Sequence, residues 1–107
     1  MMPMAATLPG AAGSCRLFRE NGLDLLNVSV NFGIPDAQIP WATPAFLAPI
    51  AERVRREAAI PVASSWSMDS AEIAERVIAE QQMDLVMIGR AHLANPHYPY
   101  VLAQKLK

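Results

Sequence analysis

The sequence predicts an α/β fold: three parallel strands that alternate with helices and form the last part of a β/α barrel of the TIM type. Apolar stretches typical of strands begin near residues 24, 60 and 84, and a stretch with helical periodicity follows each of them. Alternation of this kind implies a parallel sheet. Three parallel strands alone leave two bare edges and a poorly covered face, whereas a closed barrel needs eight βα units in roughly 250 residues. We therefore expect the 107 residues to supply the last three βα units.

Composition and charge exclude several classes of protein. Hydrophobic residues make up 52% and charged residues 18% of the chain, which indicates a globular domain and not a disordered one. The net charge of -1 gives no general attraction for nucleic acid or an anionic membrane. Cys15 is the single cysteine, which excludes an internal disulfide and a multi-cysteine metal site. We expect a cytoplasmic protein with no nucleic-acid partner and no membrane partner.

The first expected elements are a leader, the end of a helix and a strand. Residues 1–15 are small and apolar, and we expect a disordered leader that carries Cys15 as a free thiol. Residues 16–22 are typical of the last turns of a helix that Gly22 closes. A strand over residues 24–29 is apolar on both faces, as in a parallel strand covered on both sides.

A long loop and a helix come next. Residues 30–44 show no regular period, which predicts a loop longer than most connections in compact domains. A helix is expected to begin near Pro44 or, more tightly, at Pro49, because proline suits the first helical turn. The apolar side chains of this helix recur at helical spacing: Ile50, Ala51, Val54 and Ala58.

The remaining elements complete the alternation of strands and helices. We expect Asp69 to cap a helix, with Glu72 in capping-box register. The other expected elements are a strand over residues 60–64, a strand over 85–88, a short helix or turn that stops at Asn95 and Pro96, and a final helix from about Pro99 to Leu106.

Polar residues gather where the second and third strands end. Residues 64–67 (Ser-Ser-Trp-Ser) follow the second strand, and Gly89 and Arg90 follow the third. In parallel α/β folds the ligand lies at the carboxyl ends of the strands. Hydroxyl groups, backbone N–H groups at helix starts and a guanidinium suit a phosphate dianion. The sequence therefore predicts a phosphate site. An interpretation of equal weight makes Gly89 a turn residue and Arg90 a surface cation.

Other residues give weaker signals. His92 and His97 are five apart, whereas a zinc-binding helix places two histidines four apart and needs a third ligand, so we interpret both as surface or capping residues. Trp66 is either a hydrophobic plug, which we favour, or a wall against a planar ligand. No residue is nominated as a catalytic acid, base or nucleophile. The methionines are interpreted as core residues: Met68, Met83 and Met87.

Five short segments carry a family resemblance: Gly22–Ser29, Pro49–Glu57, Ile60–Val62, Asp84–Ala91 and Leu93–Pro96. In this order they resemble the C-terminal portion of the Old Yellow Enzyme family of NADH:flavin oxidoreductases, especially its thermophilic-like branch of ene-reductases. The resemblance covers residues 16–107, which would be the C-terminal part of an FMN-binding β/α barrel. It leaves residues 1–15 as a leader unlike the family.

The resemblance implies a barrel that binds FMN, is reduced by NAD(P)H and passes hydride to an activated alkene or a similar small acceptor. By position, Gly89 and Arg90 resemble the pair that holds the FMN phosphate after the eighth strand. Ser65 and Trp66 lie in the loop after the seventh strand, which usually supplies glycine backbone N–H groups to the same phosphate. Trp66 stands where a glycine is often found.

The same resemblance implies what this stretch does not carry. In the family, the residues that bind the substrate, donate the proton and contact the flavin ring lie on earlier strands, so we expect the chain alone to be inactive. Two alternatives stay open. One is a non-catalytic half-barrel that pairs through exposed strand edges, either with itself as a homo-oligomer or with a complementary chain. The other is part of a different phosphate-binding β/α barrel enzyme.

Overall fold

The computed structural model describes residues 8–30 and 43–107. The alternation of strands and helices expected from the sequence is confirmed, whereas the predicted long loop lies mostly at residues 31–42, outside the described residues. The elements are, in order, α1 (Leu8–Glu20), β1 (Leu26–Val28), α2 (Ala48–Ala58), β2 (Val62–Ser64), α3 (Ala71–Ala79), β3 (Leu85–Val86), α4 (Arg90–Ala94) and α5 (Tyr98–Lys105).

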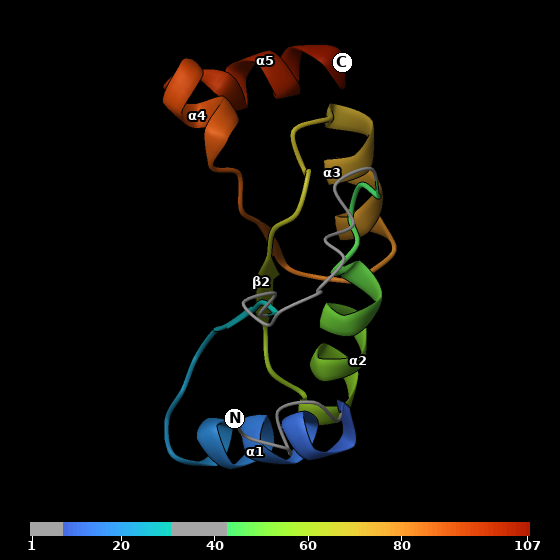
Figure 1. The fold of residues 1–107 in the computed structure, drawn as a ribbon, viewed down its shortest axis with the longest axis vertical. Coiled ribbons are helices and arrows are strands. Elements are labelled where there is room, and N and C mark those ends of the chain that lie inside the picture. Colours follow the sequence, from blue (N-terminus) through green and yellow to red (C-terminus); the bar gives the residue numbers. More distant parts are fainter. Residues whose placement is uncertain (1–7, 31–42) are drawn as a thin grey trace, which may run out of the picture.

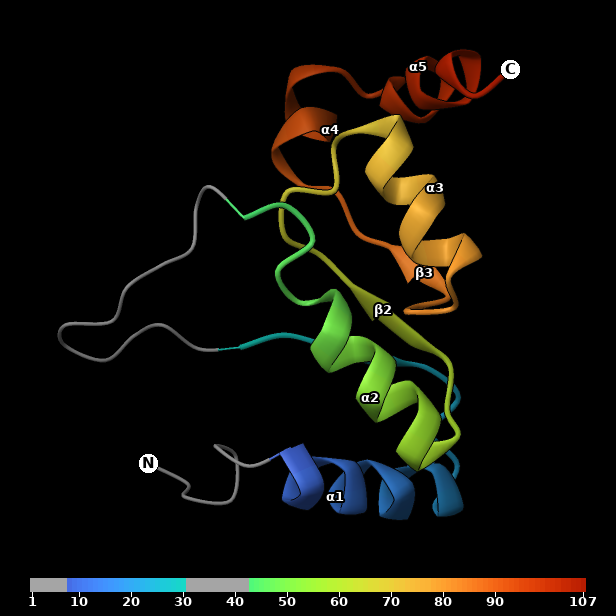
Figure 2. The same ribbon diagram turned by 90° about the vertical axis from the view of Figure 1, so that its right-hand side faces the viewer.

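The three strands form one parallel sheet in the order β1-β2-β3, with β2 in the centre. Leu26 pairs with Val62, and Ser64 pairs with Val28 on one side and Val86 on the other. The connecting helices α2 and α3 lie on the same side of the sheet, to its right in Figure 1 and in front of it in Figure 2. The predicted α/β class and parallel sheet are therefore confirmed.

The two faces of this sheet are covered differently. Side chains alternate between the faces along a strand, and Val28, Val62 and Ser64, which share the face toward the helices, are all buried. On the opposite face Asn27 is exposed and Leu85 is 53% exposed. Among residues 8–30 and 43–107, helices α2 and α3 cover one face of the sheet, and the predicted cover on the other side of the first strand is not present.

α1 begins at Leu8, well before residues 16–22, where the sequence predicted the last turns of a helix. Residues 8–15, expected in a disordered leader, belong to α1, and residues 1–7 lie outside the described part of the chain. α1 packs against α2, with Ala12 buried and Cys15 in the core cluster. Cys15 is therefore a small core residue and not a thiol in a flexible leader, and its burial raises the pKa of the thiol. The family boundary at residue 16 stays a prediction.

Gly22 closes α1 as predicted. Its φ of 101° lies in the region that favours glycine. The Gly22 N–H donates to the Arg19 carbonyl at 3.1 Å, and the Leu23 N–H donates to the Phe18 carbonyl at 3.0 Å. This pair of hydrogen bonds is the Schellman motif, which satisfies carbonyl groups that the helix itself leaves without a partner.

Arginine side chains of α1 bind the end of α2. Nη2 of Arg16 donates to the Glu57 carbonyl at 2.7 Å, and Nη1 of Arg19 donates to the Ala59 carbonyl at 3.4 Å. The last carbonyls of a helix have no partner within the helix, and a cation at that end also interacts favourably with the helix dipole. These bonds fasten α1 to the layer of helices that covers the sheet.

The starts of α2 and α3 differ in how well they were predicted. α2 begins at Ala48 with Pro49 in its first turn, which matches the tighter of the two predicted starts. The N-cap of α3 is Ser70 and not Asp69: Ser70 Oγ accepts from the Ile73 N–H at 3.4 Å. Ser70 Oγ also donates to the Glu72 carboxylate at 2.8 Å. An N-cap side chain accepts from the N–H two or three residues after it, and Ser70 lies three residues before Ile73. The helix therefore starts one residue later than expected.

The last elements agree with the prediction apart from small shifts at their ends. β3 ends at Val86, two residues early, and α4 ends before Asn95 as expected. α5 is shifted by one residue, and the Tyr98 hydroxyl donates to the Asp69 carbonyl, which ties α5 to the start of α3. Among the described residues, no helix is long and apolar enough to cross a membrane.

Candidate functional site

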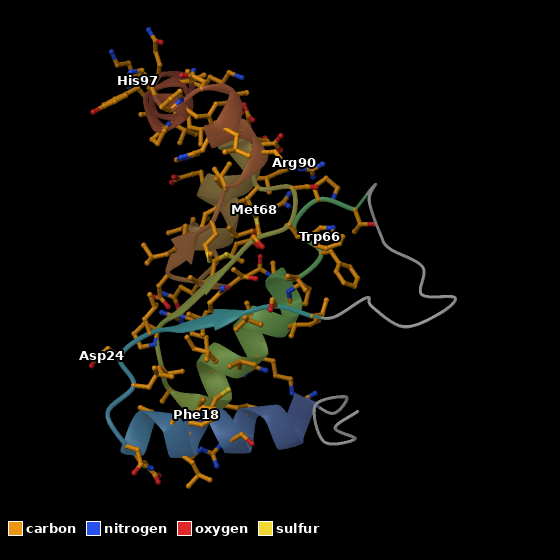
Figure 3. The ribbon with its side chains drawn as sticks, turned by 60° about the vertical axis from the view of Figure 1, so that its left-hand side comes forward. Phe18, Asp24, Trp66, Met68, Arg90 and His97 are labelled. Carbon is orange, nitrogen blue, oxygen red and sulfur yellow. The ribbon has the colours of Figure 1, made fainter. Side chains whose placement is uncertain are left out.

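A cavity of about 700 Å³ lies at the carboxyl ends of β2 and β3. Its walls are the two segments that follow these strands, residues 65–69 and 87–91. In Figure 3 Trp66, Met68 and Arg90 lie together, well away from Phe18 at the bottom of the picture. The structure thus brings the four predicted binding residues to one cavity: Ser65, Trp66, Gly89 and Arg90.

Gly89 and Arg90 form the corner where β3 leads into α4. Gly89 has a φ of -101°, which other residues also adopt, and a Cβ added to it would meet no heavy atom within 4 Å. Neither the backbone nor the packing of the described residues therefore requires glycine here. The open space beside Gly89 permits a ligand to approach the backbone closely. Arg90 is exposed, and the helix that begins with it has five residues. The positive charge at this corner is therefore that of the Arg90 guanidinium.

The loop after β2 has a left-handed backbone at two consecutive residues. φ is 98° at Trp66 and 52° at Ser67. Values in this range favour glycine, and a bulky residue there costs on the order of 1–3 kcal/mol. The family resemblance put Trp66 where a glycine is often found, and this chain keeps a glycine-like φ at that position without the glycine. Strained residues of this kind gather at functional sites.

Trp66 is half-buried and makes contacts away from the cavity as well as lining it. Its indole lies against the ring of Phe46, with ring centroids 5.9 Å apart and the planes tilted by 53°. Its carbonyl accepts a hydrogen bond from the Ala45 N–H at 3.0 Å. Trp66 is therefore packed as a plug would be and also forms part of the cavity wall.

Charge is sparse around the cavity. Among the described residues that line it, Arg90 is basic and Asp69, which is exposed, is acidic. Because a carboxylate repels an anion, the binding of an anion here depends on the Arg90 guanidinium. Ser65 and Ser67 add hydroxyl groups. Ser64, predicted in the same cradle, is buried, and its Oγ donates to the Val28 carbonyl at 2.8 Å, so it links β1 to β2 instead.

The apolar walls were missed by sequence reasoning. Met68 was interpreted as a core residue, and it is buried but also lines the cavity. Met87 was interpreted in the same way, yet it is 41% exposed. The signal for Met87 was the alternation along the strand, because Met87 lies two residues after exposed Leu85. Ile88 and Ala91 complete this wall.

His92 and His97 are exposed, as a surface role predicts. The His92 ring lies 6.4 Å from the Tyr98 ring, and the His97 ring lies 6.2 Å from the Tyr100 ring. His97 is the N-cap of α5 but makes no side-chain capping bond. Across residues 8–30 and 43–107, no three histidine, cysteine or carboxylate side chains are placed to hold a metal ion.

The chain is similar in sequence to several NADPH dehydrogenases. No protein-family model matches the chain. An NADPH dehydrogenase of Geobacillus thermodenitrificans is 40% identical over 88 residues, which cover 82% of this chain and 25% of the relative. An NADPH dehydrogenase of another Geobacillus is 33% identical over 104 residues, 97% of this chain and 30% of the relative. One from Bacillus pumilus is 30% identical over 95 residues, 89% of this chain and 28% of the relative.

These relatives are much longer than the chain, which spans between 25% and 30% of their length. The matches confirm the family resemblance that the five short sequence segments carry.

Proposed function

Since the chain is related in sequence to NADPH dehydrogenases and carries segments typical of the Old Yellow Enzyme family, we propose that it is part of an FMN-dependent NADPH oxidoreductase. Within that enzyme it supplies the end of the barrel that binds the FMN phosphate. The acceptor would be a small molecule such as an activated alkene.

One observation carries this proposal: the ends of two neighbouring parallel strands meet at a single cavity with Arg90 on one wall and Ser65 and Ser67 on the other. A phosphate dianion suits a guanidinium flanked by hydroxyl and backbone donors. Gly89 fits the same ligand, since the space where its Cβ would lie is open. The residues present therefore fit the phosphate end of FMN.

The residues of the chain have a binding role in this proposal. When bound, FMN would supply the chemistry of hydride transfer between NADPH and the acceptor. Arg90 would neutralise the phosphate and Gly89 would let it approach the backbone, while Ser65 and Trp66 would form the opposite wall. None of these residues moves a proton or forms a bond to the substrate, so turnover requires the parts of the barrel that hold the flavin ring.

The incomplete cover of the sheet supports the assignment to a partial barrel. In a closed β/α barrel one face of each strand meets the helices and the other meets the barrel interior. Here the face away from the helices carries exposed Asn27, Leu85 and Met87. These residues would point into the interior that the remaining strands close.

Replacing Arg90 with alanine is expected to weaken the affinity for FMN about tenfold, because the phosphate loses a charged donor while Asp69 remains. Titration of FMN with the purified chain, followed by flavin fluorescence, gives the dissociation constant. Arg56→Ala is the matched control, since Arg56 is exposed on α2 and does not line the cavity. Equal FMN affinity in the Arg90 variant and the wild type would contradict the phosphate role.

The face of the sheet away from α2 and α3, called the bare face below, also favours a second candidate, a non-catalytic interaction module. Leu25, Leu85 and Met87 are each 41% exposed or more, and apolar residues gathered on one face mark a surface that another element covers. The mass of the purified chain in solution separates the candidates. A stable homodimer or larger assembly with no affinity for FMN would favour the interaction module, whereas a monomer that binds FMN would exclude it.

A further inference from the structure

We propose that Phe46 is a positioning residue of the cavity: its ring, packed against the indole of Trp66, holds the loop after β2 in the left-handed backbone that shapes the cavity wall. The inference rests on the proposed phosphate site and adds a residue from outside it. Phe46 does not line the cavity and lies 19 or more positions before any residue that does.

Phe46 and its neighbour hold Trp66 at two different places. The ring centroids of Phe46 and Trp66 are 5.9 Å apart and tilted by 53°, within the range in which aromatic pairs attract. The Ala45 N–H donates to the Trp66 carbonyl at 3.0 Å. One contact fixes the side chain and the other fixes the backbone, so the conformation of residue 66 is specified from residues 45 and 46.

The segment that makes these contacts is itself fixed to the core. Ala45, Leu47 and Ala48 are buried around Phe46, and the Ala45 carbonyl accepts from the Ala48 N–H at 3.0 Å. α2 follows directly at Ala48 and packs against the sheet through Ala51 and Val54. Phe46 therefore connects the loop to α2, whose buried side chains belong to the core cluster.

Such a hold is required because of the residue at position 66. At a φ of 98°, tryptophan is strained and relaxes if nothing restrains it. Glycine adopts the same φ without strain. A relaxed loop would carry residues 65–67 away from the cavity, and the apparent affinity for a ligand falls by the fraction of molecules that keep the competent conformation. The effect of losing Phe46 should therefore depend on which residue occupies position 66.

The test compares four forms of the full chain: wild type, Phe46→Ala, Trp66→Gly and the double variant. We expect Phe46→Ala to weaken the affinity for FMN on the order of tenfold when residue 66 is tryptophan, and to change it by less than about twofold when residue 66 is glycine. Phe46→Leu keeps apolar volume without the ring, so it should lower the affinity for FMN less than Phe46→Ala does. This smaller loss should again disappear when residue 66 is glycine. Phe18→Ala is the matched control, since Phe18 is half-exposed on α1, far from Trp66 (Figure 3).

Amide hydrogen exchange of residues 65–68 gives a second measurement that needs no ligand. Phe46→Ala should speed exchange there at least tenfold with tryptophan at position 66 and little with glycine. An equal effect of Phe46→Ala on both backgrounds would reduce Phe46 to a general packing residue and overturn the inference. So would unchanged exchange in Phe46→Ala. A third outcome is that the exchange rates follow the expected pattern but none of the four forms binds FMN. That outcome would overturn the proposed function and leave the positioning role of Phe46 intact.

Discussion

Replacing Met83 with alanine is expected to lower the free energy of unfolding by about 2–5 kcal/mol, the range for large-to-small changes in a packed core. Met83 lies just before β3 and is 1% exposed. It belongs to the core cluster with Val62 and Val77, between α3 and the sheet. Because domains of this size have a total stability of about 5–15 kcal/mol, a loss of this size would leave a large fraction of the chain unfolded at moderate urea concentration.

Met87→Ala is the matched control for this substitution. It removes the same atoms from a side chain that is 41% exposed on the bare face of the sheet, and we expect a loss of less than about 1 kcal/mol. Urea unfolding followed by circular dichroism measures both variants. Equal losses at the two positions would mean that the core does not lie between α3 and β3.

Replacing Asp84 with alanine is expected to lower the free energy of unfolding by about 2 kcal/mol, because three hydrogen bonds end on its carboxylate. Arg55 donates to it through Nε at 2.9 Å and through Nη2 at 3.2 Å. The Val62 N–H donates to Oδ2 at 2.9 Å, and the Asp84 N–H in turn donates to the Val62 carbonyl at 2.8 Å. Asp84 thus joins α2, the start of β2 and the start of β3. The side chains of the ion pair are one-third exposed, so solvent screening keeps the loss near this value.

The pair formed by Arg53 and Glu57 is the control for Asp84. It has a bond of similar length, 2.9 Å, but connects two residues of one helix, and such pairs contribute about 0.3–0.5 kcal/mol. Glu57→Gln should therefore lower the free energy of unfolding by less than about 0.5 kcal/mol. A loss from Glu57→Gln as large as that from Asp84→Ala would contradict the joining role of Asp84.

The same contacts give the stability a pH dependence. The Arg55 guanidinium, and then the Val62 N–H, hold the pKa of the Asp84 carboxyl below its usual range. A carboxyl whose folded-state pKa is lowered stabilises the fold above the unfolded-state pKa of about 3.9. That contribution is lost as the pH falls from about 4 through the lower, folded-state pKa. Asp84→Asn should show a smaller drop in unfolding free energy over this pH window than the wild type, and an identical drop would contradict the assignment.

Much of the fold could be predicted from local patterns. Gly22 and Pro49 mark helix ends through backbone preferences that act within a few residues, and both predictions agree with the structure. The cap of α3 was placed one residue early because Asp69 and Ser70 are both good caps and only the geometry of the first turn separates them. The helix predicted over residues 16–22 was shorter than α1, because Ala12 and Cys15 become core residues through contact with α2, which the local sequence does not encode.

The candidate site was predictable in position and less so in detail. A parallel sheet brings the ends of β2 and β3 together, so Ser65, Trp66, Gly89 and Arg90 were expected to meet. The left-handed φ of Trp66 and its contact with Phe46 depend on a segment 20 residues away in the sequence. No local preference favours tryptophan in that conformation, so this part of the site required the structure.

The measurement that tests the central claim most directly is a nuclear magnetic resonance titration of the chain with FMN and, separately, with riboflavin. Riboflavin has the same ring and sugar alcohol as FMN but no phosphate. If the cavity binds the phosphate, FMN will shift the amide resonances of residues 65–67, Gly89 and Arg90, and riboflavin will leave them unchanged. Equal shifts with both ligands, or none with FMN, would contradict the claim that this corner of the sheet holds the FMN phosphate.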